Sequence, residues 1–429
     1  MNPLFRNDKP GQFPASWYAV TSKPPPQREA LKGAQRADVA ILGAGYTGLT
    51  AALELARKGL SVTVVEAHRA GFGASGRNGG QVGSGYNLSQ STLEKELGEG
   101  PARALWDLSM DAKAMVKDFC ADHAPDARFT PGVAHGAWSH RDFAELRDDA
   151  DHLSQAYGCD LEVLEGDAFR NLVRSPVYAG GTLDRDAGHV HPLRYCLALA
   201  REAEAAGARI FEGSPVTEVR KGRLVTAQGQ IQADHVILAG NGYMPALSVP
   251  YAARVCPINS FIAATEPLKD PGAILAKDIA VADDRFVVNY FRLSEDGRLL
   301  FGGRENYGIG FPKDITTRLR QRMLHIFPQL ANAQLDYVWG GTLGITTRRV
   351  PLVRQLEPGL WAAGGFSGHG VALTAIAGRC LAEAVTHDTS KFDVLSKLPC
   401  PPFPGGSHLR APLLTLAMTW YALRDKLGI

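Results

Sequence analysis

Short apolar runs that end in glycine-rich turns are the main feature of the hydrophobic pattern. The runs 39–42, 62–65 and 236–239 have the length and composition of strands buried in a parallel sheet. Between the first two, apolar residues recur at helical spacing at Leu49, Ala52, Leu53 and Ala56, and Lys58-Gly59 ends this pattern. The segment 39–65 therefore predicts a strand, a helix and a second strand.

The turn inside this unit has the glycine spacing of a dinucleotide-binding loop. Gly43 permits a sharp turn, Gly45 lets a pyrophosphate approach the helix N-terminus, and Gly48 lets the helix lie close to the strand. Glu66 closes the second strand at about the 20-residue offset of a carboxylate that binds ribose hydroxyls. The full strand, helix, strand and acid context indicates a bound ADP moiety.

Two further glycine-rich segments extend this prediction. The segment 70–81 has no apolar periodicity, so it is either a solvated linker or a loop whose N–H groups and Arg77 contact phosphate or a flavin ring. The segment 360–371 repeats the strand and glycine turn and leads into a helix of small residues at 371–384. The N-terminus of that helix suits the electron-rich edge of a reduced flavin.

The remaining pattern predicts a second, less regular domain. Helical patterning covers 102–124 and 142–157, and antiparallel strands are expected at 261–265, 285–293 and 298–303. We expect a mixed α/β fold with an N-terminal arm (1–36) and a discontinuous Rossmann-type FAD/NAD(P)-binding domain (37–90, 190–250 and 345–400). An antiparallel-sheet substrate domain (91–189 and 251–344) interrupts it, and an amphipathic tail (401–429) follows.

Composition excludes several classes of protein. Lys and Arg number 46 against 44 Asp and Glu, so no nucleic-acid footprint is expected. The six cysteines are scattered without a CxxC pair, which indicates neither a disulfide framework nor a metal site. A polar, proline-rich start and the lack of an 18-residue apolar span predict a cytoplasmic protein. The tail at 409–427 stays open between docking on the domain body, a partner subunit and a membrane surface.

Histidines are the candidate catalytic residues. His369 lies in the turn before the helix at 371–384, where it either contacts flavin and substrate or supports the glycine turn. His189 and His191 flank Val190, and Pro192 suggests that a helix starts there. His191 is therefore either a substrate contact or part of a helix start. No acid or cysteine accompanies these histidines, so no metal is expected.

Four motifs together resemble a known family. The segment 38–66, the loop GASGRNGGQ, the strand VILAGNGY and the turn AAGGFSGHGV resemble FAD-dependent oxidoreductases of the D-amino-acid-oxidase-like superfamily, which includes glycine and sarcosine oxidases. GRNGGQ, AGHVHPLRYCLALA and GFSGHGVALTAIAG are similar to the γ-glutamylputrescine oxidoreductase branch. The resemblance covers about 17–384 and implies an FAD-dependent oxidation of an amine.

The resemblance also implies which residues bind the cofactor. Its motifs place the pyrophosphate, ribose and adenine contacts at Gly43, Gly45, Tyr46, Thr47, Gly48, Glu66, Ala67, Val216, Ala239 and Gly240. The flavin contacts would be Ala74, Ser75, Arg77, Asn78, Gly79, Gly365, Phe366, Ser367, Gly368, His369, Gly370 and Val371. No attachment cysteine matches, so FAD is expected to be non-covalent.

Two departures from the better-known relatives affect the predicted substrate. The arginine that clamps an α-carboxylate is missing from the strand at 339–347, which leaves Arg304 or Arg349 as the clamp. The lysine that promotes reaction with oxygen is missing from 297–303, so the acceptor is oxygen or another carrier. We expect a polyamine or γ-glutamyl-polyamine substrate. A secondary or cyclic amino acid (sarcosine, glycine or pipecolate) and a subunit or maturation factor with structural flavin are the alternatives.

Overall fold

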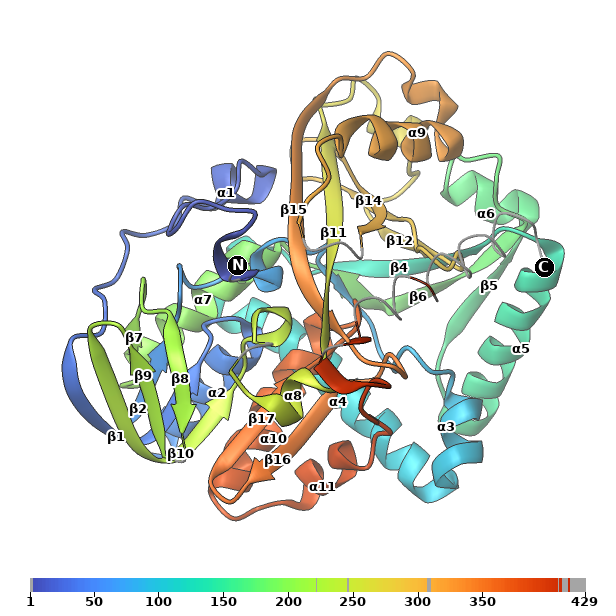
Figure 1. Ribbon diagram of the computed structural model, residues 1–429. Coiled ribbons are helices and arrows are strands. Elements are labelled where there is room, and N and C mark those ends of the chain that lie inside the picture. Colours follow the sequence, from blue (N-terminus) through green and yellow to red (C-terminus); the bar gives the residue numbers. More distant parts are fainter. Residues whose placement is uncertain are drawn as a thin grey trace.

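Two β-sheets, each covered by helices, organise the chain (Figure 1). The computed structural model describes residues 3–220, 222–244, 247–306, 310–407, 409–410 and 416. In Figure 1 the first sheet lies at the left and bottom, and the second lies at the right and top.

The first sheet has a parallel centre. Its strands follow the order β16-β17-β10-β1-β2-β7, in which β1 pairs in parallel with both β10 and β2. Its bounds are β1 Gly33–Leu42, β2 Val62–Val65, β7 Arg209–Phe211, β8 Val216–Arg220, β9 Arg223–Thr226, β10 Gly229–Leu238, β16 Leu352–Glu357 and β17 Leu360–Gly364. Because parallel strands end at the same edge, the turns after β1, β2, β10 and β17 are brought together.

Helices pack on one face of this sheet and form a large apolar core with it. They are α2 Tyr46–Arg57, α4 Glu99–His123, α7 Pro192–Ala205 and α10 Val371–Val385. The small residues of α10 let it approach α2 closely, because a Cβ at Gly378 would lie 2.7 Å from the Thr47 carbonyl oxygen. α4 also packs on α10, although it comes from the segment predicted for the substrate domain.

The second sheet is mainly antiparallel and has the order β15-β11-β14-β13-β12-β4-β6-β3, with β5 paired to β6. Its bounds are β3 Gln81–Val82, β4 Thr130–Ala137, β5 Leu161–Glu165, β6 Gly180–His189, β11 Cys256–Thr265, β12 Ala280–Asp283, β13 Tyr290–Leu293, β14 Leu299–Asn306 and β15 Leu335–Ile345. Helices α6 Gly166–Leu172 and α9 Thr316–Ile326 pack against it, and α5 His140–Tyr157 lies beside β4 and β6. The remaining helices are α1 Trp17–Ser22, α3 Gln90–Leu97, α8 Val249–Ala252 and α11 Ser390–Ser396.

The predicted mixed α/β class is confirmed, while one predicted strand was wrong over part of its length. The pattern predicted a strand at 285–293, but β13 begins at Tyr290. The Asp283 carboxylate accepts hydrogen bonds from the backbone N–H groups of Arg285 and Asn289, at 3.3 and 2.8 Å. These donors are therefore withdrawn from a sheet ladder, and a turn forms.

Both ends of the chain depart from a simple arm and tail. β1 begins at Gly33, inside the predicted arm, and Trp17 and Tyr18 of α1 are buried against the second sheet. The predicted tail helix at 409–427 lies largely outside the described residues, but Arg410 at its start donates to the carbonyls of Ala252 and Val255. In the described part of the chain, no helix has the length and hydropathy needed to cross a membrane.

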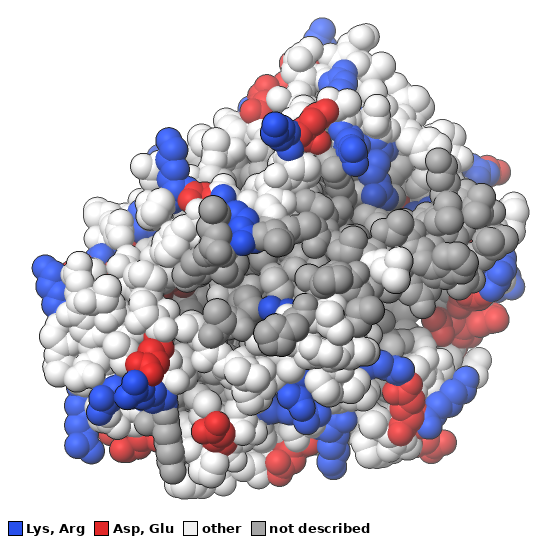
Figure 2. Space-filling model, viewed as in Figure 1, with Lys and Arg blue, Asp and Glu red and all other residues white. Residues whose placement is uncertain are grey.

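Charges of both signs alternate around the visible face. Figure 2 shows Lys and Arg interspersed with Asp and Glu over the parts of this face that are not grey. This distribution matches the nearly balanced composition of the chain.

Candidate functional site

A pocket opens at the carboxyl ends of β1, β2 and β10, where the glycine turn leads into α2. Its wall includes many of the predicted cofactor contacts: Gly43, Gly45, Tyr46, Thr47, Glu66, Ala67, Ala74, Ser75, Val216, Ala239, Gly240 and, from the turn after β17, Phe366. The structure therefore brings together residues from separate parts of the sequence at one edge of the parallel sheet.

The backbone of the glycine turn is accessible because Gly43 and Gly45 have no side chains, and a side chain at either residue would clash with its surroundings. Gly43 has a φ of +104°, and a Cβ at this residue would lie 2.9 Å from the Ala239 carbonyl oxygen. A Cβ at Gly45 would lie 2.9 Å from Ser75 Oγ, which accepts a hydrogen bond from Tyr46 N. Gly45 is the N-cap of α2 and has no side-chain cap, so the amide groups of the first turn suit a pyrophosphate.

Glu66 is held at the end of β2 with its carboxylate toward the pocket. Its two oxygens accept hydrogen bonds from Ala44 N and His68 N, each at 2.9 Å. Burial raises the pKa of Glu66, while these backbone donors oppose that shift. The remaining lone pairs of the carboxylate can accept hydrogen bonds from ribose hydroxyls.

Arg77 lies next to the pocket but does not line it. Its guanidinium pairs with Asp8 at 3.0 Å, donates to the Phe72 and Gly340 carbonyls and stacks over the Phe72 ring. The buried Nη2 atom has no hydrogen-bond partner among the described residues. An unsatisfied buried donor destabilises the folded protein, and an electron-rich cofactor group beside it would accept its hydrogen bond.

Asn78 shapes the same loop rather than the pocket wall. Its side-chain amide donates to the Ala74 and Ser75 carbonyls, and its oxygen accepts from Gly80 N at 2.8 Å. Gly79 packs against the Tyr290 ring. These contacts fix the course of the loop that carries Ala74 and Ser75.

His369 lies in the turn before α10, where Gly365, Ser367, Gly368 and Gly370 surround it in sequence. Its Nε2 donates to the Ser84 carbonyl at 3.2 Å, and Val371 begins the helix without a side-chain cap. Burial, with a smaller contribution from nearby His135, lowers the pKa of His369 to about 4. The ring is therefore neutral near pH 7, but it is not part of the pocket wall.

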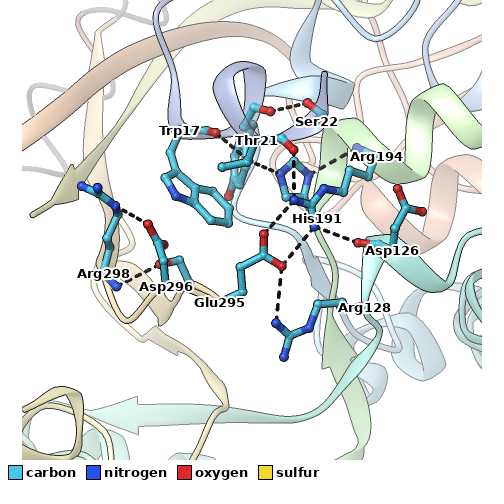
Figure 3. Close-up of polar contacts among 12 residues, drawn as sticks. Trp17, Thr21, Ser22, Asp126, Arg128, His191, Arg194, Glu295, Asp296 and Arg298 are labelled. Carbon is cyan, nitrogen blue, oxygen red and sulfur yellow. Dashed lines mark hydrogen bonds and ion pairs between the residues drawn. The ribbon is translucent and has the colours of Figure 1, made fainter. Parts of the chain in front are cut away.

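The described side-chain contacts of His191 are with α1 and α7 and not with the turn that carries His369. It is the N-cap of α7, because its Nδ1 accepts from Arg194 N at 3.2 Å, and its Nε2 contacts Thr21 Oγ1 at 2.9 Å (Figure 3). Its ring packs against Trp17 and Tyr18, and burial holds its pKa well below the usual value. His189 contacts Asp278 instead. The Nδ1 bond to Arg194 N fits the helix-start interpretation of His191.

The backbone of Arg349 lies near the turn that carries His369, because both accept hydrogen bonds from the same side chain. Asn87 Nδ2 donates to the carbonyls of both Arg349 and Ser367, at 3.1 and 2.9 Å. The Arg349 guanidinium stacks over the Phe286 ring at 4.9 Å, and no ion pair to it is found among the described side chains. Arg348, in contrast, pairs with Glu96. The side chain of Arg304 lies outside the described residues.

Sequence reasoning missed about half of the pocket wall. The additional residues are Leu4, Leu42, Ala44, Val65, His68, Phe72, Gly73, Ser214, Asn241, Tyr243, Leu247, Thr342 and Thr374. Asn241 and Tyr243 follow the third glycine-ended strand, so its turn signal could have identified them. Leu4 and Thr342 carried no local signal, because only the folded chain brings them to the pocket.

Comparisons with known proteins agree with this geometry. The family model described as "FAD dependent oxidoreductase" matches residues 38–384. The chain is 42% identical to "Probable oxidoreductase OrdL" of Rhizobium meliloti (strain 1021), with 96% of this chain and 97% of that protein covered. It is 35% identical to "Gamma-glutamylputrescine oxidoreductase" of Escherichia coli (strain K12), with 97% and 99% covered.

Solved structures show the same fold. Glycine oxidase from Geobacillus kaustophilus matches with a TM-score of 0.70 at 22% identity, covering 82% of this chain and 95% of that one. The glycine turns, the pocket at the sheet edge and the family match over residues 38–384 lead to one identification. The chain belongs to the FAD dependent oxidoreductase family.

Proposed function

We propose that this enzyme oxidises a C–N bond of a γ-glutamylated or free polyamine. Hydride removal from the carbon next to nitrogen gives an imine, and water hydrolyses the imine to an aldehyde and an amine. The observation that carries this proposal is the 35% identity, over nearly the whole of both chains, to a relative named as a γ-glutamylputrescine oxidoreductase. β15 also supports it, because this strand carries no arginine, whereas the resemblance to glycine and D-amino-acid oxidases implies a carboxylate-clamping arginine there.

The cofactor contacts follow the pocket wall. When bound, FAD supplies an acceptor for the hydride of the substrate. The amide groups at Gly45 and Thr47, with Tyr46 N shared between Ser75 Oγ and the phosphate, would hold its pyrophosphate. Glu66 would bind its ribose, and Val216 its adenine end. Arg77 and the uncapped N-terminus of α10 would donate to the flavin end.

Non-covalent FAD gives a first test. The purified protein should be yellow, and acid or heat denaturation should release all of the flavin into the supernatant as FAD. The reason is that none of the described pocket-lining residues is a cysteine. Absorbance near ~450 nm and chromatography of the supernatant measure this. Flavin that precipitates with the polypeptide would contradict non-covalent binding.

Arg349 is the proposed partner of the substrate carboxylate. Its guanidinium stacks on the Phe286 ring, and its backbone carbonyl shares the Asn87 side-chain amide with Ser367 of the turn that carries His369. A γ-glutamyl group carries a carboxylate distant from the amine that reacts, so its recognition does not need an arginine in β15. Free polyamines lack this carboxylate and would gain nothing from Arg349.

Replacing Arg349 by methionine should raise KM for a γ-glutamyl amine by about 10- to 100-fold, the usual value of a charge-assisted hydrogen bond. The KM for the corresponding free polyamine should stay unchanged. Steady-state kinetics with both substrates measure this effect. Arg348→Met is the matched control, since Arg348 already pairs with Glu96. Equal KM changes for both substrates would show that Arg349 does not recognise the substrate carboxylate.

An anaerobic screen tests the proposed function as a whole. Free polyamines, γ-glutamyl amines, sarcosine, glycine and pipecolate are each mixed with the FAD-loaded protein, and bleaching of the flavin is followed. Reduction by polyamines or their γ-glutamyl forms supports the proposal, whereas preferential reduction by an amino acid overturns it. If none reduces the flavin without another protein, a structural flavin is the better explanation. Adding oxygen afterwards separates an oxidase from a dehydrogenase.

A further inference from the structure

N-terminal residues that the family match does not reach contribute to the cofactor pocket. The match begins at residue 38, yet Leu4 lines the cofactor pocket together with Glu66, Ala67 and His68. Residues 3–13 are called the strap. The strap lies against the loop 68–77, which connects β2 to the predicted flavin contacts.

His68 binds the strap at two points. Its Nδ1 accepts a hydrogen bond from Gly11 N at 3.1 Å, and its Nε2 donates to the Leu4 carbonyl at 2.8 Å. One neutral tautomer makes both bonds, because it offers one acceptor and one donor. The ring stacks on Phe72 with centroids 3.8 Å apart, and Phe5 of the strap packs beside it. The backbone N–H of the same histidine donates to Glu66 at the pocket.

Asp8 supplies a buried counter-charge. Its carboxylate pairs with Arg77 at 3.0 Å, and the two side chains are only 9% and 2% exposed. Breaking a buried pair by removing one charge is strongly destabilising, so the pair favours the closed strap. Since Arg77 belongs to the loop predicted beside the flavin, the strap and the cofactor site share this residue.

The chain after the strap is anchored firmly on the first sheet. Arg28 donates to Glu212 and Glu204, and Arg69 also binds Glu212, whose side chain is 1% exposed. Leu31 N donates to Ser214 Oγ, and Ser214 lines the pocket. The strap is therefore a segment with one anchored end. Residues 4, 8 and 11 hold it to the loop 68–77, Asn7 Oδ1 accepts a hydrogen bond from Phe311 N at 2.9 Å, and the Phe13 ring packs against Phe72.

We propose that residues 3–13 form the outer wall of the FAD site and must lift before FAD enters or leaves. This proposal rests on FAD as cofactor and is independent of the amine that the enzyme oxidises.

Asp8→Asn tests the proposal directly. The FAD-loaded variant should release FAD at least about 10-fold faster than the unmodified protein after dilution at pH 8, because the buried ion pair no longer holds the strap. Ultrafiltration followed by absorbance of the filtrate gives the rate. Glu162→Gln is the matched control, because it removes an exposed ion pair with Arg185 away from the pocket. Release at the unmodified rate from folded Asp8→Asn protein would overturn the proposal.

A second variant keeps the test decisive if Asp8→Asn does not fold. Leu4→Ala shortens only the side chain that closes the pocket, and it should also speed FAD release. Unchanged FAD release from folded Leu4→Ala protein would overturn the role of the strap in FAD exchange, even if reduction of the flavin by substrate became slower.

The pH dependence of release gives an independent measurement. Burial lowers the pKa of His68 and outweighs the Leu4 carbonyl and Asp8, which raise it, while Arg77 also lowers it. The Glu66 carboxylate accepts from the His68 backbone N–H. A histidine with a lowered pKa in the closed state favours closure above the open-state pKa of about 6.5 and loses that contribution as pH falls. FAD release should therefore accelerate below about pH 6.5. His68→Gln, which keeps a donor and an acceptor but does not ionise, should flatten this acceleration, and an unchanged profile would contradict the two-point contact.

Discussion

Replacing Gly45 by valine is expected to abolish FAD retention. The new Cβ would lie 2.9 Å from Ser75 Oγ, and its two methyl groups would occupy the space above the first turn of α2. The pyrophosphate must approach the backbone amide groups there, so the variant loses the contact on which ADP binding depends. Flavin content after gel filtration, as a ratio of absorbance near ~450 nm to that at ~280 nm, measures the loss.

Gly100→Val is the matched control for this substitution. Gly100 lies in α4, and a Cβ there meets no atom within 4 Å. This control should retain a full complement of FAD. A folded Gly45→Val protein that also kept its FAD would show that the turn after β1 is not the phosphate site. Circular dichroism of both variants separates loss of cofactor from loss of fold.

Replacing His369 by alanine is expected to leave FAD bound and slow its reduction by substrate about 10²-fold. The residue is neutral near pH 7, because burial lowers its pKa to about 4, and it lies in the turn at the start of α10. A positioned hydrogen bond that acts on developing charge is worth about this much, whereas a packing contact is worth almost nothing.

Anaerobic stopped-flow reduction at saturating amine is the suitable measurement, because steady-state turnover depends on the acceptor as well. His369→Gln keeps a donor toward the Ser84 carbonyl and serves as a partial rescue. If alanine and glutamine variants both reduce flavin at the unmodified rate, His369 only supports the turn. Arg349 then becomes the next candidate at this end of the site.

The fold was predictable wherever burial leaves a recognisable pattern of apolar residues in the sequence. β2 occupies 62–65 as expected, since all four residues are buried, and α10 begins at Val371 as the glycine turn indicated. β1 is longer than its apolar run, because residues 33–37 pair with β10 through their backbone, which needs no apolar side chains. Hydrogen-bonded pairing of exposed residues leaves no hydrophobic signal.

The candidate site was predictable where the residues that line it belong to one continuous motif. Gly43, Gly45 and Glu66 lie in one unit, and the structure brings all three to the pocket. Leu4, Thr342 and the Asp8 to Arg77 pair were missed because their partners are distant in sequence. His191 shows the converse, since its neighbour Pro192 correctly indicated the start of α7.

The parallel pairing of β10 with β17 has a consequence for biosynthesis. β17 pairs with β10, and α10 packs on α2 and adds Thr374 to the wall of the cofactor pocket, yet they end only at residues 364 and 385. A nascent chain that has already released β1, α2 and β2 from the ribosome must keep the apolar face of α2 without α10 until synthesis is nearly finished. Such long-range pairing slows folding and exposes aggregation-prone surface. Assembly of the flavoprotein should therefore be post-translational, with chaperone demand concentrated in the interval between residues 65 and 364.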